Sequence, residues 1–148
     1  TLFEGGIRVP FCIAGDTVAK PGISGALVHT VDLFATIAAL FGVKTSTTAA
    51  PTVGQDSQDL APLLANPKAA WRDFNYSELF GNPQGSPDQE GRAITDGQFK
   101  LIQYASGAEA FFDLIADRHE TKELKALGLS GKAKQAYDAL SVRLSGLK

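Results

Sequence analysis

The sequence contains a single cysteine, no methionine, and no strong excess of either charge. One cysteine, Cys12, excludes an internal disulfide, and in its apolar surroundings we expect a small buried side chain rather than a reactive thiolate. A net charge of −2 gives no reason to expect nucleic acid or an anionic membrane as a partner. No apolar run approaches the roughly 18 residues that a membrane-spanning helix needs. Because the chain opens on Thr1 and lacks methionine, we expect it to be part of a longer protein.

The most informative stretch is the first ten residues, which read Thr-Leu-Phe-Glu-Gly-Gly-Ile-Arg-Val-Pro. The adjacent glycines Gly5 and Gly6 allow a tight turn or a close approach to a neighbouring group. The following run, Val9–Ala14, is almost wholly apolar and does not alternate with polar residues. This pattern predicts a strand covered on both faces, as in a parallel sheet between helices.

The middle of the chain contains one clear helical pattern. Residues 32–41 carry a broad apolar face, which predicts a largely buried helix. Residues 44–58 are rich in Thr, Ser, Ala, Gly and Pro and predict a connecting loop.

From Trp71 onward the pattern becomes that of an antiparallel sheet. Strands are expected over Phe74–Phe80 and Ala110–Leu114, with a hairpin between them over Arg92–Tyr104. Asp96-Gly97 predicts a two-residue type I′ turn in that hairpin. A last helix is expected from a Ser130 cap to about Leu147, with apolar residues every three or four positions. This part is therefore predicted to be an α+β unit with four antiparallel strands and a C-terminal helix.

Several segments of the sequence resemble the sulfatase family of the alkaline phosphatase-like superfamily. Glu4–Pro10 resembles a late motif of these enzymes, and the segment from Phe111 to Leu124 resembles their closing Leu-Tyr-Asp-Leu block. Val31–Thr36 resembles the family's Val-Asp-Leu-x-Pro-Thr, with Ala35 in place of proline. Residues 59–64 resemble a short helical segment of the family, so a short helix is expected there. The segments follow one another in the order that the family has them.

The resemblance implies an α/β parent enzyme of which this chain is the C-terminal part. Residues 1–50 would be the end of the catalytic α/β domain with its last strand and helix, 51–70 a connecting segment, and 71–148 the C-terminal subdomain. The parent would hydrolyse a sulfate monoester of a sulfated small molecule or glycan, either a sugar or an aryl sulfate. It would use formylglycine and calcium, and would be periplasmic or secreted.

The same resemblance places the catalytic groups outside this chain. The family's formylglycine, its calcium ligands and a sulfate-contacting lysine all precede the position of Thr1. Cys12 is followed by Ile-Ala-Gly-Asp, which does not match the family's Cys/Ser-x-Pro-x-Arg pattern. We therefore assign no catalytic or metal-binding residue here and expect the chain alone to be inactive.

Arg92 is the one candidate for contact with the substrate. It ends the irregular stretch Asn82–Gly91, and long loops in compact domains are often functional. Its guanidinium would offer a fork of donors to an anionic group. The alternative is a solvated loop with Arg92 in a salt bridge.

Other polar residues favour structural roles. We expect His29 to cap or pack against the helix, His119 to be solvated, and Glu4 and Arg8 to form an ion pair. The spacing of three further acidic residues suggests a calcium site. Capping or salt bridging is the better interpretation, because the turn between them has no glycine and does not match a calcium-binding loop. These residues are Asp113, Asp117 and Glu120.

Two alternatives to a sulfatase remain open from the sequence alone. A phosphatase or phosphonate ester hydrolase of the same superfamily would carry the same late motifs, since the discriminating residues lie elsewhere. A non-catalytic binding or structural module is the other class. We also expect residues 1–45 to associate with another chain or copy, because a strand without neighbours leaves an unpaired edge and apolar surface.

Overall fold

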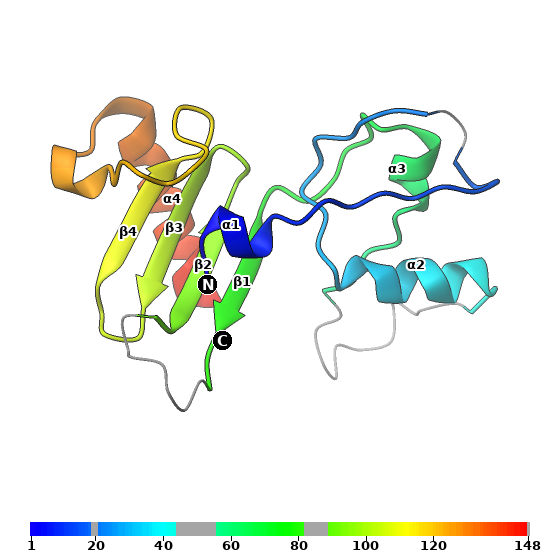
Figure 1. Cartoon of the computed structure of the whole chain (residues 1–148), viewed down its shortest axis with the longest axis horizontal. Coiled ribbons are helices and arrows are strands. Elements are labelled where there is room, and N and C mark those ends of the chain that lie inside the picture. The colour runs from blue at the N-terminus through cyan, green and yellow to red at the C-terminus, as the bar shows by residue number, and fades with distance from the viewer. Residues whose placement is uncertain (19–20, 44–55, 82–88, 148) are drawn as a thin grey trace. The chain divides into compact units, whose positions relative to one another are not determined.

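The computed structural model describes residues 1–18, 21–43, 56–81 and 89–147. The chain divides into two compact units, one formed by Thr1–Phe11 with Asp73–Lys148, the other by Cys12–Arg72 (Figure 1). The domain boundaries predicted after residues 50 and 70 refer to the domains of the longer parent protein, so they stay a prediction. Among the described residues, no helix is long and apolar enough to cross a membrane.

The first unit is built on a four-stranded antiparallel sheet in the order β1-β2-β3-β4. The strands are β1 (Asn75–Leu79), β2 (Gly91–Thr95), β3 (Phe99–Tyr104) and β4 (Glu109–Asp113). Each strand pairs with the next along the chain, with Ile94 opposite Leu101 and Leu101 opposite Phe111. The predicted sheet and its mixed α+β class are therefore confirmed.

The hairpin between β2 and β3 is found where it was predicted, but its turn type is different. Three residues separate the two strands, and only Gly97 among them has a positive φ, of 92°. A type I′ turn would require positive φ at two successive residues. Instead, the Asp96 carboxylate accepts hydrogen bonds from the backbone N–H groups of Gln98 and Phe99 at 2.9 and 2.6 Å. This local side-chain bonding stabilises the longer turn.

One face of the sheet is covered by α4 (Gly131–Gly146), the predicted C-terminal helix. Ser130 occupies the N-cap position with extended backbone but makes no side-chain capping hydrogen bond. Apolar side chains of the helix pack on those of β2, β3 and β4 to form the first core. Its buried members are Ile94, Phe99, Leu101, Phe111, Leu140 and Leu144.

The opposite face of the sheet is covered by the N-terminal segment, which contains the short helix α1 (Glu4–Ile7). Figure 1 shows α1 and α4 on opposite sides of the sheet. Leu2 is buried there, and the Phe3 ring meets the Phe112 ring edge-on with centroids 5.9 Å apart. The buried members of this second core are Leu2, Ala93, Ile102, Ala110, Phe112 and Leu114.

The strand expected over Val9–Ala14 is wrong for this chain. The segment has no strand structure, and Val9 and Phe11 are 62% and 47% exposed. An interior strand needs partners on both edges, and none of the described strands pairs with this segment. For the same reason the prediction of a buried Cys12 is wrong, since the thiol lies in this uncovered segment and is exposed.

The second unit contains α2 (Asp32–Leu40) and α3 (Ala61–Ala65), so both predicted helices are present. The expectation that the first of them is largely buried is wrong, because Phe34, Ile37 and Leu40 are 62%, 51% and 60% exposed. Only Asp32, Ala35 and Thr36 of α2 are buried, since no described element covers the apolar face of the helix.

Asp32 is fully buried at the start of α2. Its carboxylate is paired with Arg72 and accepts hydrogen bonds from the backbone N–H groups of His29 and Gln58 at 2.8 and 3.0 Å. One carboxylate thus joins three separate segments of this unit.

Candidate functional site

The most unusual polar group in the first unit is Lys100 of β3, whose side chain is fully buried. It points to the α1 side of the sheet because it alternates with Leu101, which packs on α4. Its Nζ lies 3.0 Å from Glu4 Oε1 and 2.8 Å from Glu120 Oε1. A buried ammonium requires such partners, because an unpaired charge is costly to desolvate. We call Glu4, Lys100 and Glu120 the ionic cluster.

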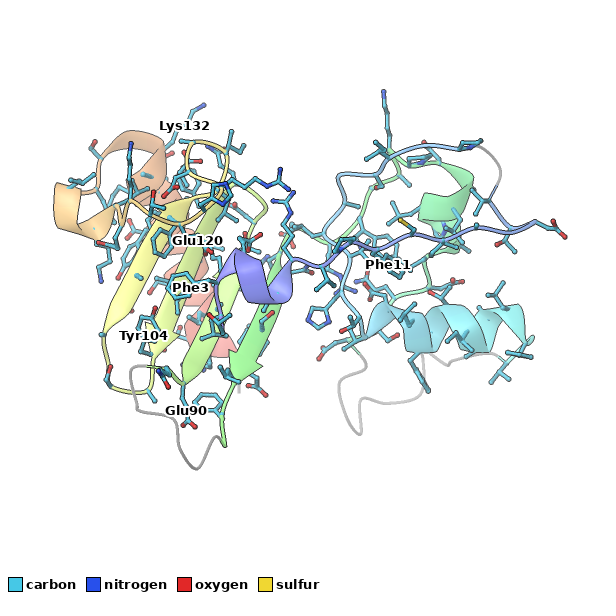
Figure 2. The ribbon with its side chains drawn as sticks, viewed as in Figure 1. Phe3, Phe11, Glu90, Tyr104, Glu120 and Lys132 are labelled. Carbon is cyan, nitrogen blue, oxygen red and sulfur yellow. The ribbon has the colours of Figure 1, made fainter. Side chains whose placement is uncertain are left out.

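Glu120 completes the ionic cluster by binding the backbone of α1. Its Oε2 accepts a hydrogen bond of 2.5 Å from the backbone N–H of Glu4. Figure 2 shows the side chains of Phe3 and Glu120 beside α1. Glu120 is also the only described non-glycine residue with positive φ, 54°, a conformation that is strained for a residue with a Cβ. The strained backbone therefore belongs to the residue whose carboxylate binds the N-terminal segment to the sheet.

The two glycines of α1 differ in their surroundings. A Cβ on Gly6 would lie 2.2 Å from Cγ2 and 3.0 Å from the carbonyl oxygen of Thr1, so a side chain there would clash. A Cβ on Gly5 would meet no atom within 4 Å. Arg8, whose side chain is 56% exposed, lies 3.8 Å from the Glu4 carboxylate, as predicted for a structural ion pair.

Arg92 belongs to a second polar network, on the α4 side of the sheet. Its Nη2 donates to Gln103 Oε1 at 2.7 Å, and its Nη1 donates to the carbonyl oxygen of Leu147 at 3.1 Å. Gln103 in turn donates to Glu109, which also accepts hydrogen bonds from Lys125 and Tyr137 at 2.6 Å each. The guanidinium therefore joins β2, β3 and the end of α4. Most of the loop before Arg92 lies outside the described residues.

The titration of this network follows from its contacts. Burial acts to raise the pKa of Glu109, but hydrogen bonds from Lys125 and Tyr137 outweigh it and hold that pKa below its ordinary value of 4.5. The hydrogen bond to Glu109 raises the pKa of Tyr137, and burial adds to this effect. On β1, burial and the Glu78 carboxylate raise the pKa of Tyr76 to about 12. At neutral pH the network therefore holds an ionised Glu109 and protonated tyrosines.

The remaining sequence candidates have structural surroundings. His29 accepts a hydrogen bond from the Val31 N–H through Nδ1 in the turn just before α2, but no side-chain hydrogen bond caps the helix itself, and His119 is exposed. The Asp113 and Asp117 carboxylates accept backbone N–H groups of the following turns, as predicted for capping residues. In the described part of the chain, no three His, Cys, Asp or Glu side chains are grouped as a metal site would need.

Sequence reasoning missed Lys100 as a residue that organises the N-terminal segment. The position of Lys100 within the strand Phe99–Tyr104 was the available signal. Its neighbours in the sequence are buried and apolar, and its side chain lies on the same face of the sheet as buried Ile102. A lysine on an apolar face predicts a buried partner of opposite charge. The partners themselves lie 96 residues before and 20 residues after it, beyond any local pattern.

Comparison with known proteins identifies the family. The family model for the C-terminal region of N-sulphoglucosamine sulphohydrolase matches residues 1–148. Human arylsulfatase A is 31% identical over 118 residues, covering 79% of this chain and 21% of the relative. Bovine arylsulfatase A is 30% identical over 110 residues, covering 73% of this chain and 20% of the relative.

A solved structure shares the fold. It is that of a protein in complex with its substrate D-glucosamine-2-N,6-O-disulfate, and it matches with a TM-score of 0.56 and 22% identity. The match covers 76% of this chain and 22% of that protein. The chain thus spans about a fifth of the length of the sulfatases that it matches. Since the family model matches its whole length, this chain belongs to the sulfatase family as a C-terminal region of the N-sulphoglucosamine sulphohydrolase type.

Proposed function

We propose that the complete protein removes a sulfate group from a sulfated sugar, with sulfated glucosamine as the first candidate substrate. The observation that carries this proposal is the match of residues 1–148 to the C-terminal region of N-sulphoglucosamine sulphohydrolase. It is supported by the solved relative, whose substrate is a glucosamine disulfate. An aryl sulfate is the second candidate, supported by the two arylsulfatase relatives. The test is to incubate the complete protein with a sulfated glucosamine and with an aryl sulfate and to measure the inorganic sulfate released from each.

The chemical groups of this reaction would come from the part of the protein outside this chain. Hydrolysis of a sulfate ester needs a nucleophile, a cation that binds the anionic group and an acid for the leaving alcohol. Sulfatases use a metal, and a hard cation such as calcium prefers several oxygen ligands. The described residues hold no cluster that fits it, so we derive no catalytic step through this chain. We propose formylglycine and calcium in the catalytic part, and an extracytoplasmic location.

We further propose that other parts of the sulfatase cover the apolar surface of residues 1–45. On α2 and just beyond it, several large apolar side chains are exposed in this chain. They include Phe34, Ile37, Leu40, Phe41 and Val43. Several large exposed apolar side chains on one short stretch of chain favour an interface. The catalytic part is the proposed partner because this chain is only about a fifth of a sulfatase.

Arg92 is proposed to contribute to the binding of an extended saccharide. In the complete protein, Arg92→Ala is expected to raise KM for a sulfated oligosaccharide about tenfold, the value of a charged hydrogen bond. KM for a small arylsulfate should change much less, because the lost contact is remote from the reacting sulfate. The measurement is steady-state kinetics on both substrates.

Gln103→Ala is the matched control, because it removes the partner of Arg92 on β3 but leaves the cation. If Arg92 serves only to hold β3 and the end of α4, both variants will lower the thermal midpoint and leave both KM values unchanged. That result would refute a role of Arg92 in substrate binding.

A further inference from the structure

The outer edge of β4 is covered by the chain segment that follows it. Among the described strands β4 pairs with β3 alone, so its other edge would carry unpaired backbone groups if nothing lay against it. Instead, the N–H of Phe111 donates to Glu123 Oε1 at 2.9 Å, and the carbonyl oxygen of Phe111 accepts the N–H of Leu124 at 2.8 Å. Glu123 Oε1 also accepts the N–H of Lys125 at 2.9 Å. We call residues 117–125 the strap.

The strap is held together by Asp117 at its start. The N–H of Asp117 donates to the carbonyl oxygen of Asp113, the last residue of β4, at 2.8 Å. The Asp117 carboxylate accepts the Thr121 hydroxyl at 3.1 Å and the N–H of Lys122 at 2.7 Å. The N–H of Glu120 donates to the carbonyl oxygen of Asp117 at 3.2 Å. These bonds within the strap favour its movement as a whole over separate movement of its two ends.

The strap also binds the N-terminal segment, through the ionic cluster. Glu120 lies in the middle of the strap, and its two carboxylate oxygens contact Lys100 Nζ and the N–H of Glu4. Three positions further on, Glu123 is bound to the edge of β4. Because one short segment carries both carboxylates, displacement of the strap from β4 would also withdraw Glu120 from Lys100 and Glu4.

We propose that the strap opens as one unit, and that its opening uncovers the edge of β4 and frees the backbone of Glu4 at the same time. The closed strap takes the place of a fifth strand, so it prevents the edge of β4 from pairing with another chain. Its opening is a local unfolding step that requires less free energy than unfolding of the whole unit. The strap thus links the covering of one sheet edge to the anchoring of a residue 116 positions away from Glu120.

Hydrogen exchange of two backbone amides tests the proposal. The N–H of Leu124 donates to β4 and the N–H of Glu4 donates to Glu120, so neither depends directly on Glu123. In the unmodified chain both amides should have one common protection factor, lower than that of the β3 amides, which exchange only when the sheet unfolds. Glu123→Ala should accelerate the exchange of both amides by the same factor, about tenfold or more, because it removes the charged acceptor of two N–H groups.

Two further variants serve as controls. Glu123→Gln keeps a side-chain oxygen that can accept the same N–H groups, so it should restore most of the protection. Glu78→Ala removes a carboxylate that accepts the Tyr76 hydroxyl on β1, at the other edge of the sheet, and should change neither amide by more than about twofold. Faster exchange of Leu124 without Glu4 would show that the ends of the strap open separately. Equal protection of Glu4 and the β3 amides would show that the strap does not open by itself, and either result would overturn the proposal.

Discussion

Replacement of Lys100 by methionine should destabilise the first unit by about 3–5 kcal/mol, the cost of breaking a buried ion pair. Methionine keeps the length of the side chain but removes the charge, so Glu4 and Glu120 would lose their buried cation. Only the largely exposed Arg8 would remain near them, 3.8 Å from the Glu4 carboxylate. The N-terminal segment should detach first, because the ionic cluster joins it to the sheet. Urea unfolding followed by far-ultraviolet circular dichroism measures the free energy, and hydrogen exchange of β2–β4 locates the loss.

Lys134→Met is the control for this substitution. Lys134 pairs with Asp138 one turn along α4, where both side chains are more than half exposed. Such surface pairs contribute at most about 1 kcal/mol. A combined variant with Glu4→Gln, Lys100→Met and Glu120→Gln should recover part of the loss, because it leaves no charge buried. A loss for Lys100→Met no larger than that for Lys134→Met would contradict the importance of the ionic cluster.

Replacement of Asp32 by alanine should destabilise the second unit by a similar amount, about 3–5 kcal/mol. The change leaves the largely buried Arg72 without its counter-ion and removes the acceptor for two backbone N–H groups. The single tryptophan of the sequence, Trp71, precedes Arg72 and provides the measurement. Its fluorescence should report unfolding of this unit at a lower urea concentration.

Asp56→Ala provides the comparison for the second unit. Asp56 is exposed and binds the same arginine only through its backbone carbonyl oxygen, which alanine retains. This variant should unfold within about 0.5 kcal/mol of the unmodified chain. Equal fluorescence midpoints for the Asp32 and Asp56 variants would show that the buried carboxylate does not hold the unit together.

The parts of the fold that local sequence determines were predictable. Two strand-like runs on either side of Asp96-Gly97 indicate a hairpin, and the apolar residues of α4 recur at helical spacing. The strand predicted over Val9–Ala14 shows the limit of that approach. An apolar run can indicate that a segment is suited to a covered strand, but the partners that would cover it must come from elsewhere.

The candidate site was less predictable because it depends on contacts across the sequence. The resemblance of Glu4–Pro10 to a sulfatase motif located the informative segment, and its Glu4–Arg8 pair was predicted from spacing. The binding of Glu4 to Lys100 and to Glu120 joins residues 96 and 116 positions apart. No local pattern specifies such pairs. The positive φ of Glu120 likewise has no signal in the sequence, because glutamate is not a residue type that indicates a left-handed conformation.

Sulfate release is the most direct test of the conclusion that this chain is the C-terminal region of a sulfatase. The complete protein and the chain alone are each incubated with D-glucosamine-2-N,6-O-disulfate, an arylsulfate and the corresponding phosphate esters, and the inorganic product is measured. The complete protein should release sulfate from at least one sulfate ester, and the chain alone should release none above buffer. Release of phosphate without sulfate by the complete protein, or turnover by the purified chain alone, would contradict this account.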